Sequence, residues 1–137
     1  MTAPKEIIQV AAMFKRKLPN MKKASRKEIV CYLLWHMTRA SIAVVRDAGG
    51  KIIAAGTFRP IAKIEDAREQ YKFEEGAAIV YAENSVACRP DCMAGLLLAA
   101  KHRCPTMRKI ARRRHGRMIV SDFNRYFHLN RKLAYGR

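Results

Sequence analysis

The residues with the clearest capacity for chemistry are the cations that crowd the C-terminal third of the sequence. Twelve basic residues lie between Lys101 and Arg137, and Asp122 is the only acidic residue among them. Guanidinium and ammonium groups bind phosphate oxygens whatever the base sequence, with an affinity that falls as salt is added. We therefore expect a polyanion, nucleic acid first, to be bound by Arg108, Lys109, Arg112, Arg113, Arg114 and Arg117. Coenzyme phosphates, an acidic protein and a merely solvated cationic face remain as alternatives.

The cysteines form a second group that could do chemistry, as metal ligands. Cys88 and Cys92 have a spacing that zinc tolerates, and His102 and Cys104 follow them. However, Cys92 and His102 would lie about 15 Å apart along a helix, since each residue adds about 1.5 Å. We therefore expect reduced thiols and no metal, with Cys92 as the most reactive thiol because a helix N-terminus favours its thiolate.

The composition limits the class of protein. The chain has 137 residues, a formal net charge of +17 and 50% hydrophobic residues, so it can build a core and is no disordered basic tail. We expect one domain spanning residues 1–137. Neither a signal peptide nor an apolar run long enough to span a bilayer is visible, which predicts no membrane association and a cytoplasmic or intraviral location.

The elements that must position these residues begin with two helices and a hairpin. Helical spacing of apolar residues predicts a helix over Lys5–Leu18, and Ser25 with Glu28 forms a capping box for a second helix ending near Arg39. His36 is expected at the edge of the core. The runs 41–47 and 51–58, joined by Ala-Gly-Gly, predict a β-hairpin.

The rest of the chain is expected to alternate between strand and helix. Residues 59–75 are polar and predict a loop or short helix, and residues 77–87 predict a strand. Asp91 is the expected N-cap of a helix over 92–103, and a second, very basic helix should run from Pro105 to Gly116. A strand over 117–123 and a final helix from Asn124 or Arg125 complete the pattern. This order predicts an α/β fold, a mixed central sheet flanked by helices.

That order and two local patterns resemble the GCN5-related N-acetyltransferase (GNAT) superfamily. Its central strand runs into a loop of the form Q/R-x-x-G-x-G/A, which holds the pyrophosphate of acetyl-CoA at a helix N-terminus. Here Arg89 and Ala94 match, while Cys92 stands at the first glycine, so the acyl-CoA loop is degenerate. The resemblance implies acetyl-CoA or another acyl-CoA as cofactor, bound by Arg89, Cys92, Met93, Ala94 and Asn124.

The resemblance also implies candidate catalytic residues. Asn124 and the closing Lys-Leu-Ala-Tyr-Gly cadence match the family's last helix, where Arg131 replaces the usual tyrosine acid. Glu83 lies on the strand that often carries the family's general base, and Tyr81 lies two residues earlier on the same face. We expect Glu83 as base and Tyr81 as acid. For both residues, a structural role alone remains an alternative.

Two hypotheses follow for the function. The first is a reduced, divergent GNAT-like N-acyltransferase, of the kind coded by bacteriophages. The second is a non-catalytic basic protein of a phage or mobile element that binds DNA or RNA on the same fold. The acyl acceptor and the oligomeric state are left open by the sequence.

Overall fold

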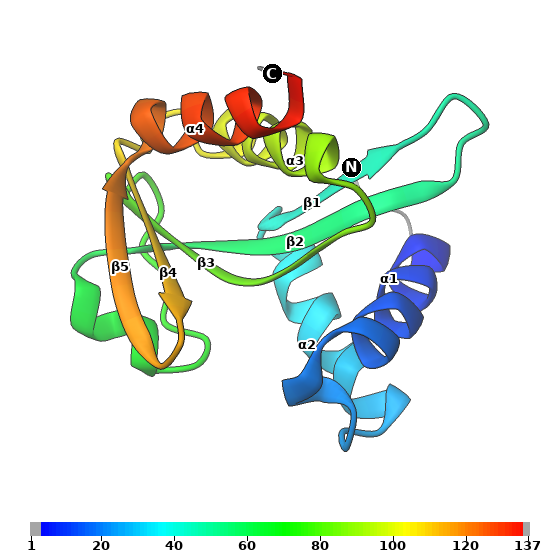
Figure 1. Cartoon of the computed structure of the whole chain (residues 1–137). Coiled ribbons are helices and arrows are strands. Elements are labelled where there is room, and N and C mark those ends of the chain that lie inside the picture. Colours follow the sequence, from blue (N-terminus) through cyan, green and yellow to red (C-terminus); the bar gives the residue numbers. More distant parts are fainter. Residues whose placement is uncertain (1–3, 136–137) are drawn as a thin grey trace.

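The computed structural model describes residues 4–135, which form a five-stranded sheet between two layers of helices (Figure 1). The strands are β1 (Ile42–Arg46), β2 (Ile52–Ile61), β3 (Ile79–Ala87), β4 (Lys109–Arg114) and β5 (Arg117–Asp122). They lie in sequence order, and β3 and β4 are parallel, whereas the other neighbours are antiparallel. The expected mixed α/β sheet is confirmed.

The helices bury one apolar core on each face of the sheet. On one face pack α1 (Pro4–Lys17) and α2 (Arg26–Thr38), joined by the short 3-10 helix η1 (Pro19–Met21). On the other lie α3 (Pro90–Arg103) and α4 (Phe123–Tyr135), which pack against β1, β2, β3 and β4. No helix of the described residues is long and apolar enough to cross a membrane.

The N-terminal half forms as the sequence predicts. The capping box of α2 is complete, because the Ser25 hydroxyl accepts from the Glu28 amide at 3.1 Å and the Glu28 carboxylate accepts from the Ser25 amide at 2.9 Å. The hairpin turns through residues 47–50, where Gly50 has a φ of 86°. His36 is fully buried rather than at the edge of the core.

The prediction of a basic helix between Pro105 and Gly116 is wrong. Residues 109–114 form β4, and a two-residue turn joins it to β5. His115 and Gly116 both have left-handed φ, 52° and 77°, which is the conformation of the tight turn whose twist suits a hairpin. The six cations therefore lie on a β-hairpin and its approach, and neighbouring ones point to opposite faces of the sheet.

Two smaller boundaries also differ from the expectation. The N-cap of α3 is Arg89 rather than Asp91, and its side chain makes no capping hydrogen bond. The second strand of the hairpin continues through Arg59 and Pro60 to Ile61, followed by the 3-10 helix η2 (Ile64–Arg68). Proline is tolerated there because the pairing with β1 stops at Thr57, so that side of β2 is an open edge.

Candidate functional site

The site is created by two parallel strands that separate. Pairing between β3 and β4 covers only Ile79–Tyr81 and Lys109–Ala111, although β3 continues to Ala87 and β4 to Arg114. On its other side β3 carries a bulge, because Ala82 pairs with Phe58 and Asn84 with Thr57, which leaves Glu83 as the extra residue. A bulge increases local twist and redirects side chains, so it accounts both for the divergence of the strands and for the direction of Glu83.

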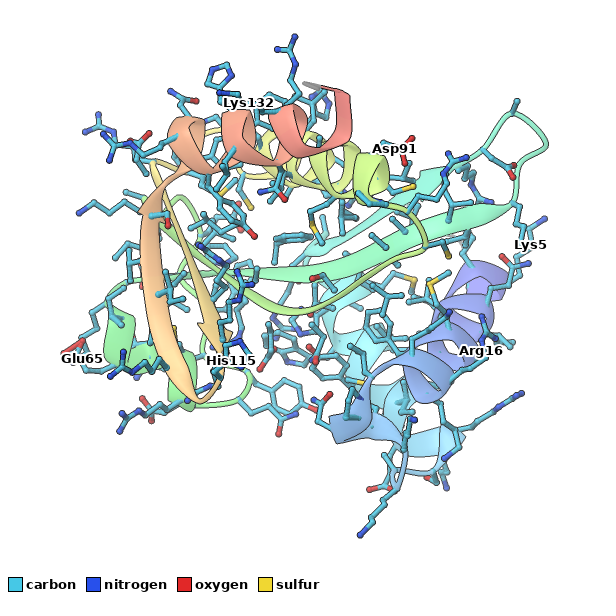
Figure 2. The ribbon with its side chains drawn as sticks, viewed as in Figure 1. Lys5, Arg16, Glu65, Asp91, His115 and Lys132 are labelled. Atoms are coloured by element: carbon cyan, nitrogen blue, oxygen red, sulfur yellow. The ribbon has the colours of Figure 1, made fainter. Side chains whose placement is uncertain are left out.

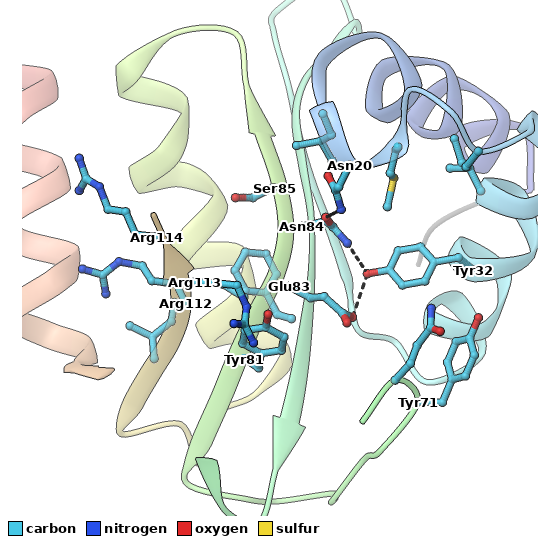
Figure 3. Close-up of a pocket in the computed structure, with 18 of the residues that line it drawn as sticks. Asn20, Tyr32, Tyr71, Tyr81, Glu83, Asn84, Ser85, Arg112, Arg113 and Arg114 are labelled. Carbon is cyan, nitrogen blue, oxygen red and sulfur yellow. Dashed lines mark hydrogen bonds between the residues drawn. The ribbon is translucent and has the colours of Figure 1, made fainter. Parts of the chain in front are cut away.

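A cleft of about 1080 Å³ opens where the strands diverge (Figure 3). Its walls come from β3, from β4, from the α1–α2 region and from α3 and α4. Polar and charged lining residues include Asn20, Lys27, Glu28, Tyr32, Gln70, Tyr71, Tyr81, Glu83, Asn84, Ser85, Arg112, Arg113, Arg114 and Tyr126. Among the expected site residues, the cleft thus brings together Glu83, Tyr81, Met93 and three of the six cations.

Glu83 lies at the centre of a network of polar side chains (Figure 3). Its Oε1 accepts a hydrogen bond from the Tyr32 hydroxyl at 2.9 Å, and its Oε2 lies 3.4 Å from Nη2 of Arg59. Asn84 donates to the same Tyr32 oxygen at 2.9 Å, and Thr57 contacts it at 2.8 Å. The Glu83 side chain is only 16% exposed, so it is no solvent-facing carboxylate at a strand edge.

The surroundings of Glu83 favour its ionised form. Burial raises its pKa, but the neighbouring His36 ring, the charge of Arg59 and the hydrogen bond from Tyr32 together lower its pKa below the ordinary value. For Tyr32 the direction is opposite, because burial and the neighbouring Glu83 charge raise the pKa of the phenol. Near neutral pH the pair is therefore a carboxylate and a neutral phenol that donates to it.

Arg59 supplies the positive charge beside Glu83 and also fixes the segment after β2. Its guanidinium is fully buried and donates to the carbonyl oxygens of Asp66, Ala67, Glu69 and Lys72 at 2.6–3.2 Å. It also donates to the Glu83 carboxylate, with 3.4 Å between Nη2 and Oε2. The same arginine thus holds η2 and the following residues against the sheet and keeps Glu83 charged.

His36 lies behind this pair. Its Nε2 is 3.6 Å from Oε1 of Glu83, and its Nδ1 is 2.7 Å from the Ser41 hydroxyl. Burial lowers the pKa of the imidazole more than Glu83 raises it. The neutral ring therefore adds a dipole, rather than a full charge, to the surroundings of Glu83.

The cations of the hairpin occupy different places. Arg112 lies over the Tyr126 ring, with 3.8 Å from its guanidinium carbon to the ring centroid, and donates to the Ser121 hydroxyl at 3.0 Å. Arg113 and Arg114 are exposed and line the cleft. Three further expected cations are exposed but are not lining residues: Arg108, Lys109 and Arg117.

The expected acyl-CoA loop lies beside the cleft, at the start of α3. Met93 lines the cleft, whereas Cys92 and Ala94 are buried in the core and Asn124 is exposed. Arg89 is exposed and its Nε lies 3.3 Å from a carboxylate oxygen of Asp91.

The thiols of the described residues do not cluster with other metal-binding side chains. Between residues 4 and 135 there is no group of three or more histidine, cysteine or acidic side chains arranged to bind an ion. Cys31 and Cys88 are exposed, Cys104 is half-buried and Cys92 is buried, so the expectation that Cys92 is the most reactive thiol is wrong. Burial raises the pKa of the Cys104 thiol.

Sequence reasoning did not assign site roles to Tyr32, Asn84 and Arg59. Tyr32 could have been found from its place four residues before the buried His36, on the same face of a helix. Arg59 carried a clearer signal, since a lone arginine between apolar strand residues needs a counterion if it is buried.

Comparison with known proteins identifies the fold. No family model and no curated protein matches the chain. A solved structure, GphF, a GNAT-like decarboxylase in complex with isobutyryl-CoA, matches with a TM-score of 0.58 and 16% sequence identity. The chain has a GNAT-like fold. The match covers 81% of this chain and 62% of GphF, so this chain spans less than two thirds of the length of GphF. At this identity the likeness concerns the fold alone.

Proposed function

We propose that this GNAT-like protein transfers an acyl group from an acyl-CoA to an amine in the cleft between β3 and β4. The observation that carries the proposal is the early end of the β3–β4 pairing, after Tyr81 and Ala111. The slot beyond it offers strand edges to an extended ligand, with Glu83 exposed to the same cleft. The isobutyryl-CoA named with GphF supports this choice of cofactor class.

The residues at the start of α3 fit the phosphate end of an acyl-CoA incompletely. Pro90 has no amide hydrogen, and the Cys92 amide donates to the Arg89 carbonyl oxygen at 3.0 Å. Asp91 adds a negative charge that Arg89 offsets. The amides of Asp91 and Met93 and the Arg89 side chain remain to bind phosphate, which predicts weaker binding than a glycine-rich loop would give.

The residues in the cleft fit the transfer step itself. A bound acyl-CoA would supply an activated thioester carbonyl. Glu83 accepts a proton from the attacking amine as the new C–N bond forms and the C–S bond breaks, and Tyr81 gives a proton to the departing sulfur. Tyr32 and Arg59 hold the Glu83 carboxylate ionised and in place. Encoding by a bacteriophage stays a prediction from the sequence.

Calorimetry with acetyl-CoA and isobutyryl-CoA tests the cofactor class, and acyl transfer to a panel of amines tests the reaction. We expect Glu83→Gln to bind acyl-CoA as the wild type does and to lose about 10²–10⁴ in turnover, the usual worth of a positioned base. Glu28→Gln is the matched control, because Glu28 is a second carboxylate lining the cleft that caps α2. No heat of binding at millimolar acyl-CoA would refute the proposal.

A further inference from the structure

The mouth of the cleft has a second basic wall, formed by the connection between α1 and α2. Residues 15–27 contain seven cations and no carboxylate. Lys15 is used structurally, since its Nζ donates to the carbonyl oxygens of Lys22 and Ala24. Lys27 lines the cleft, and we call it, together with the exposed cations Lys17, Lys22, Lys23 and Arg26, the α1–α2 rim.

The α1–α2 rim and the β4–β5 hairpin stand on opposite sides of one opening. Lys27 and its neighbours Asn20 and Ala24 line the same cleft as Arg113 and Arg114. In Figure 2, His115 of the hairpin turn and Arg16 near the end of α1 lie to the left and to the right below β2 and β3. We call Arg113, Arg114 and Arg117 the hairpin rim.

In the described part of the chain, the rim cations are not neutralised by ion pairs, although Glu28, next to Lys27, lines the same cleft. Within residues 4–135, none of the eight rim cations forms an ion pair with a carboxylate. The segment between β2 and β3 reaches the mouth too, but its five carboxylates are interspersed with three cations, Lys63, Arg68 and Lys72. Like charges held this close repel one another unless an anion lies between them.

An aromatic ring lies at the same mouth. Tyr71 lines the cleft, is 43% exposed and packs on Trp35 with 4.7 Å between ring centroids. Its φ is 69°, a left-handed conformation that a tyrosine adopts only where its surroundings enforce it. Arg59 holds the carbonyl oxygens on either side of it, those of Glu69 and Lys72. The ring is thus presented in a fixed position.

We propose that a single-stranded nucleic acid lies across this mouth, with its phosphates between the two rims and a base stacked on Tyr71. Two separated rows of cations suit a strand that bridges a cleft better than they suit a flat membrane surface. A preformed aromatic face beside them suits an unpaired base better than an acidic peptide. The proposal goes beyond acyl transfer, and binding is measured without acyl-CoA, so that the two proposals can fail separately.

Fluorescence anisotropy with labelled 12-nucleotide oligo-U and oligo-dT over a salt series tests the proposal. Log affinity should fall linearly with log salt, with a slope of about −0.7 for each phosphate contacted, or about −5.6 if all eight cations are engaged. A 12-base-pair duplex of the same length should bind at least tenfold more weakly at equal salt. The proposal would be overturned if the duplex bound as tightly as the single strand, or if polyglutamate competed as well as an unlabelled oligonucleotide does. The comparison of oligo-U with oligo-dT identifies the preferred sugar.

Three triple variants with the same loss of charge locate the site. Arg113→Ala/Arg114→Ala/Arg117→Ala and Lys22→Ala/Lys23→Ala/Arg26→Ala should each weaken binding at least tenfold and reduce the salt slope by about 2. The matched control is Lys5→Ala/Lys51→Ala/Lys132→Ala, three exposed cations that lie outside both rims. An equal loss in the control, or no loss in one of the two rims, would contradict a strand that bridges them.

Variants of Tyr71 separate the contribution of base stacking to the affinity from the contribution of charge. Tyr71→Ala should weaken oligonucleotide binding roughly tenfold with an unchanged salt slope, as expected when one stacked base is lost, and Tyr71→Phe should restore it. If Tyr71→Phe binds as weakly as Tyr71→Ala, or if neither variant changes affinity, the stacked base is refuted. Circular dichroism of each variant establishes that the fold is kept.

Discussion

Replacing Arg59 with methionine should be among the most damaging single changes in this protein. The guanidinium is fully buried and donates to four carbonyl oxygens and to Glu83. Methionine keeps much of the apolar stem but leaves the Glu83 carboxylate with no opposite charge beside it. Removing one partner of a buried ion pair costs about 3–5 kcal/mol. Glu69 and Lys72 are exposed, so water can replace the donor to their carbonyl oxygens, whereas Asp66 and Ala67 are buried. We therefore expect a total at the upper end of this range.

Urea unfolding of Arg59→Met, Glu83→Gln and the double variant measures this cost. Because Arg59 and Glu83 act as a pair, the double variant should lose less free energy of unfolding than the sum of the two single changes. Hydrogen exchange should show residues 64–72 losing protection before the rest of the sheet, since their anchor is gone. A loss below about 1 kcal/mol in Arg59→Met, or strict additivity, would refute the role of Arg59 as an anchor and counterion.

Three further outcomes can be checked directly. Gly56→Ala should lower the free energy of unfolding in urea by about 1–3 kcal/mol, because the new Cβ would lie 2.8 Å from the buried Phe58 ring and 3.2 Å from the Asn84 carbonyl oxygen. The control is Gly95→Ala, whose Cβ would meet only Val45, at 3.6 Å, and which should not destabilise the fold. Burial lowers the pKa of His36, so below about pH 6.5 the unfolded chain binds more protons than the folded protein does. The free energy of unfolding should therefore fall as the pH is lowered from about 6.5. In urea unfolding, His36→Gln should show a smaller fall over the same pH range. A thiol reagent should modify the exposed Cys31 and Cys88 rapidly and the buried Cys92 only on unfolding, and rapid loss of all the thiols would contradict this burial.

The sequence predicts those elements whose local signals agree with their tertiary surroundings. Ser25 and Glu28 mark the start of α2 because the two residues satisfy each other's backbone, whatever lies nearby. Gly49 and Gly50 mark the first hairpin for a similarly local reason. The GNAT-like order of elements was therefore recognisable, although the similarity to GphF lies at 16% identity.

The β4–β5 hairpin was not predicted because the same local sequence pattern occurs in two kinds of structure. A left-handed glycine after a basic run is typical of a helix C-terminus, and the same conformation at Gly116 is also that of a tight hairpin turn. Arginine and lysine are good helix formers, so the local preference favoured the wrong element. Ile110 and Ala111 decide the outcome, because they are buried on opposite faces of the sheet, in the core under α3 and in the cluster beside η2. Such contacts depend on distant residues.

The observation that residues 109–114 form a strand, not a helix, also changes how the cations of this protein could bind a polyanion. On a helix, the cations from 108 to 117 would form one surface and could bind a polyanion by themselves. On a hairpin they are divided, because Arg112, Arg113 and Arg114 line the cleft, with Arg112 over the Tyr126 ring, whereas Arg108, Lys109 and Arg117 do not line it. A strand bound only by the hairpin would then contact few phosphates, and the salt dependence would be shallow. In the proposed complex, the cations of the α1–α2 connection, on the far side of the same cleft, make the remaining phosphate contacts. The salt slope of each rim variant therefore distinguishes a strand that bridges the cleft from one bound to a basic surface patch.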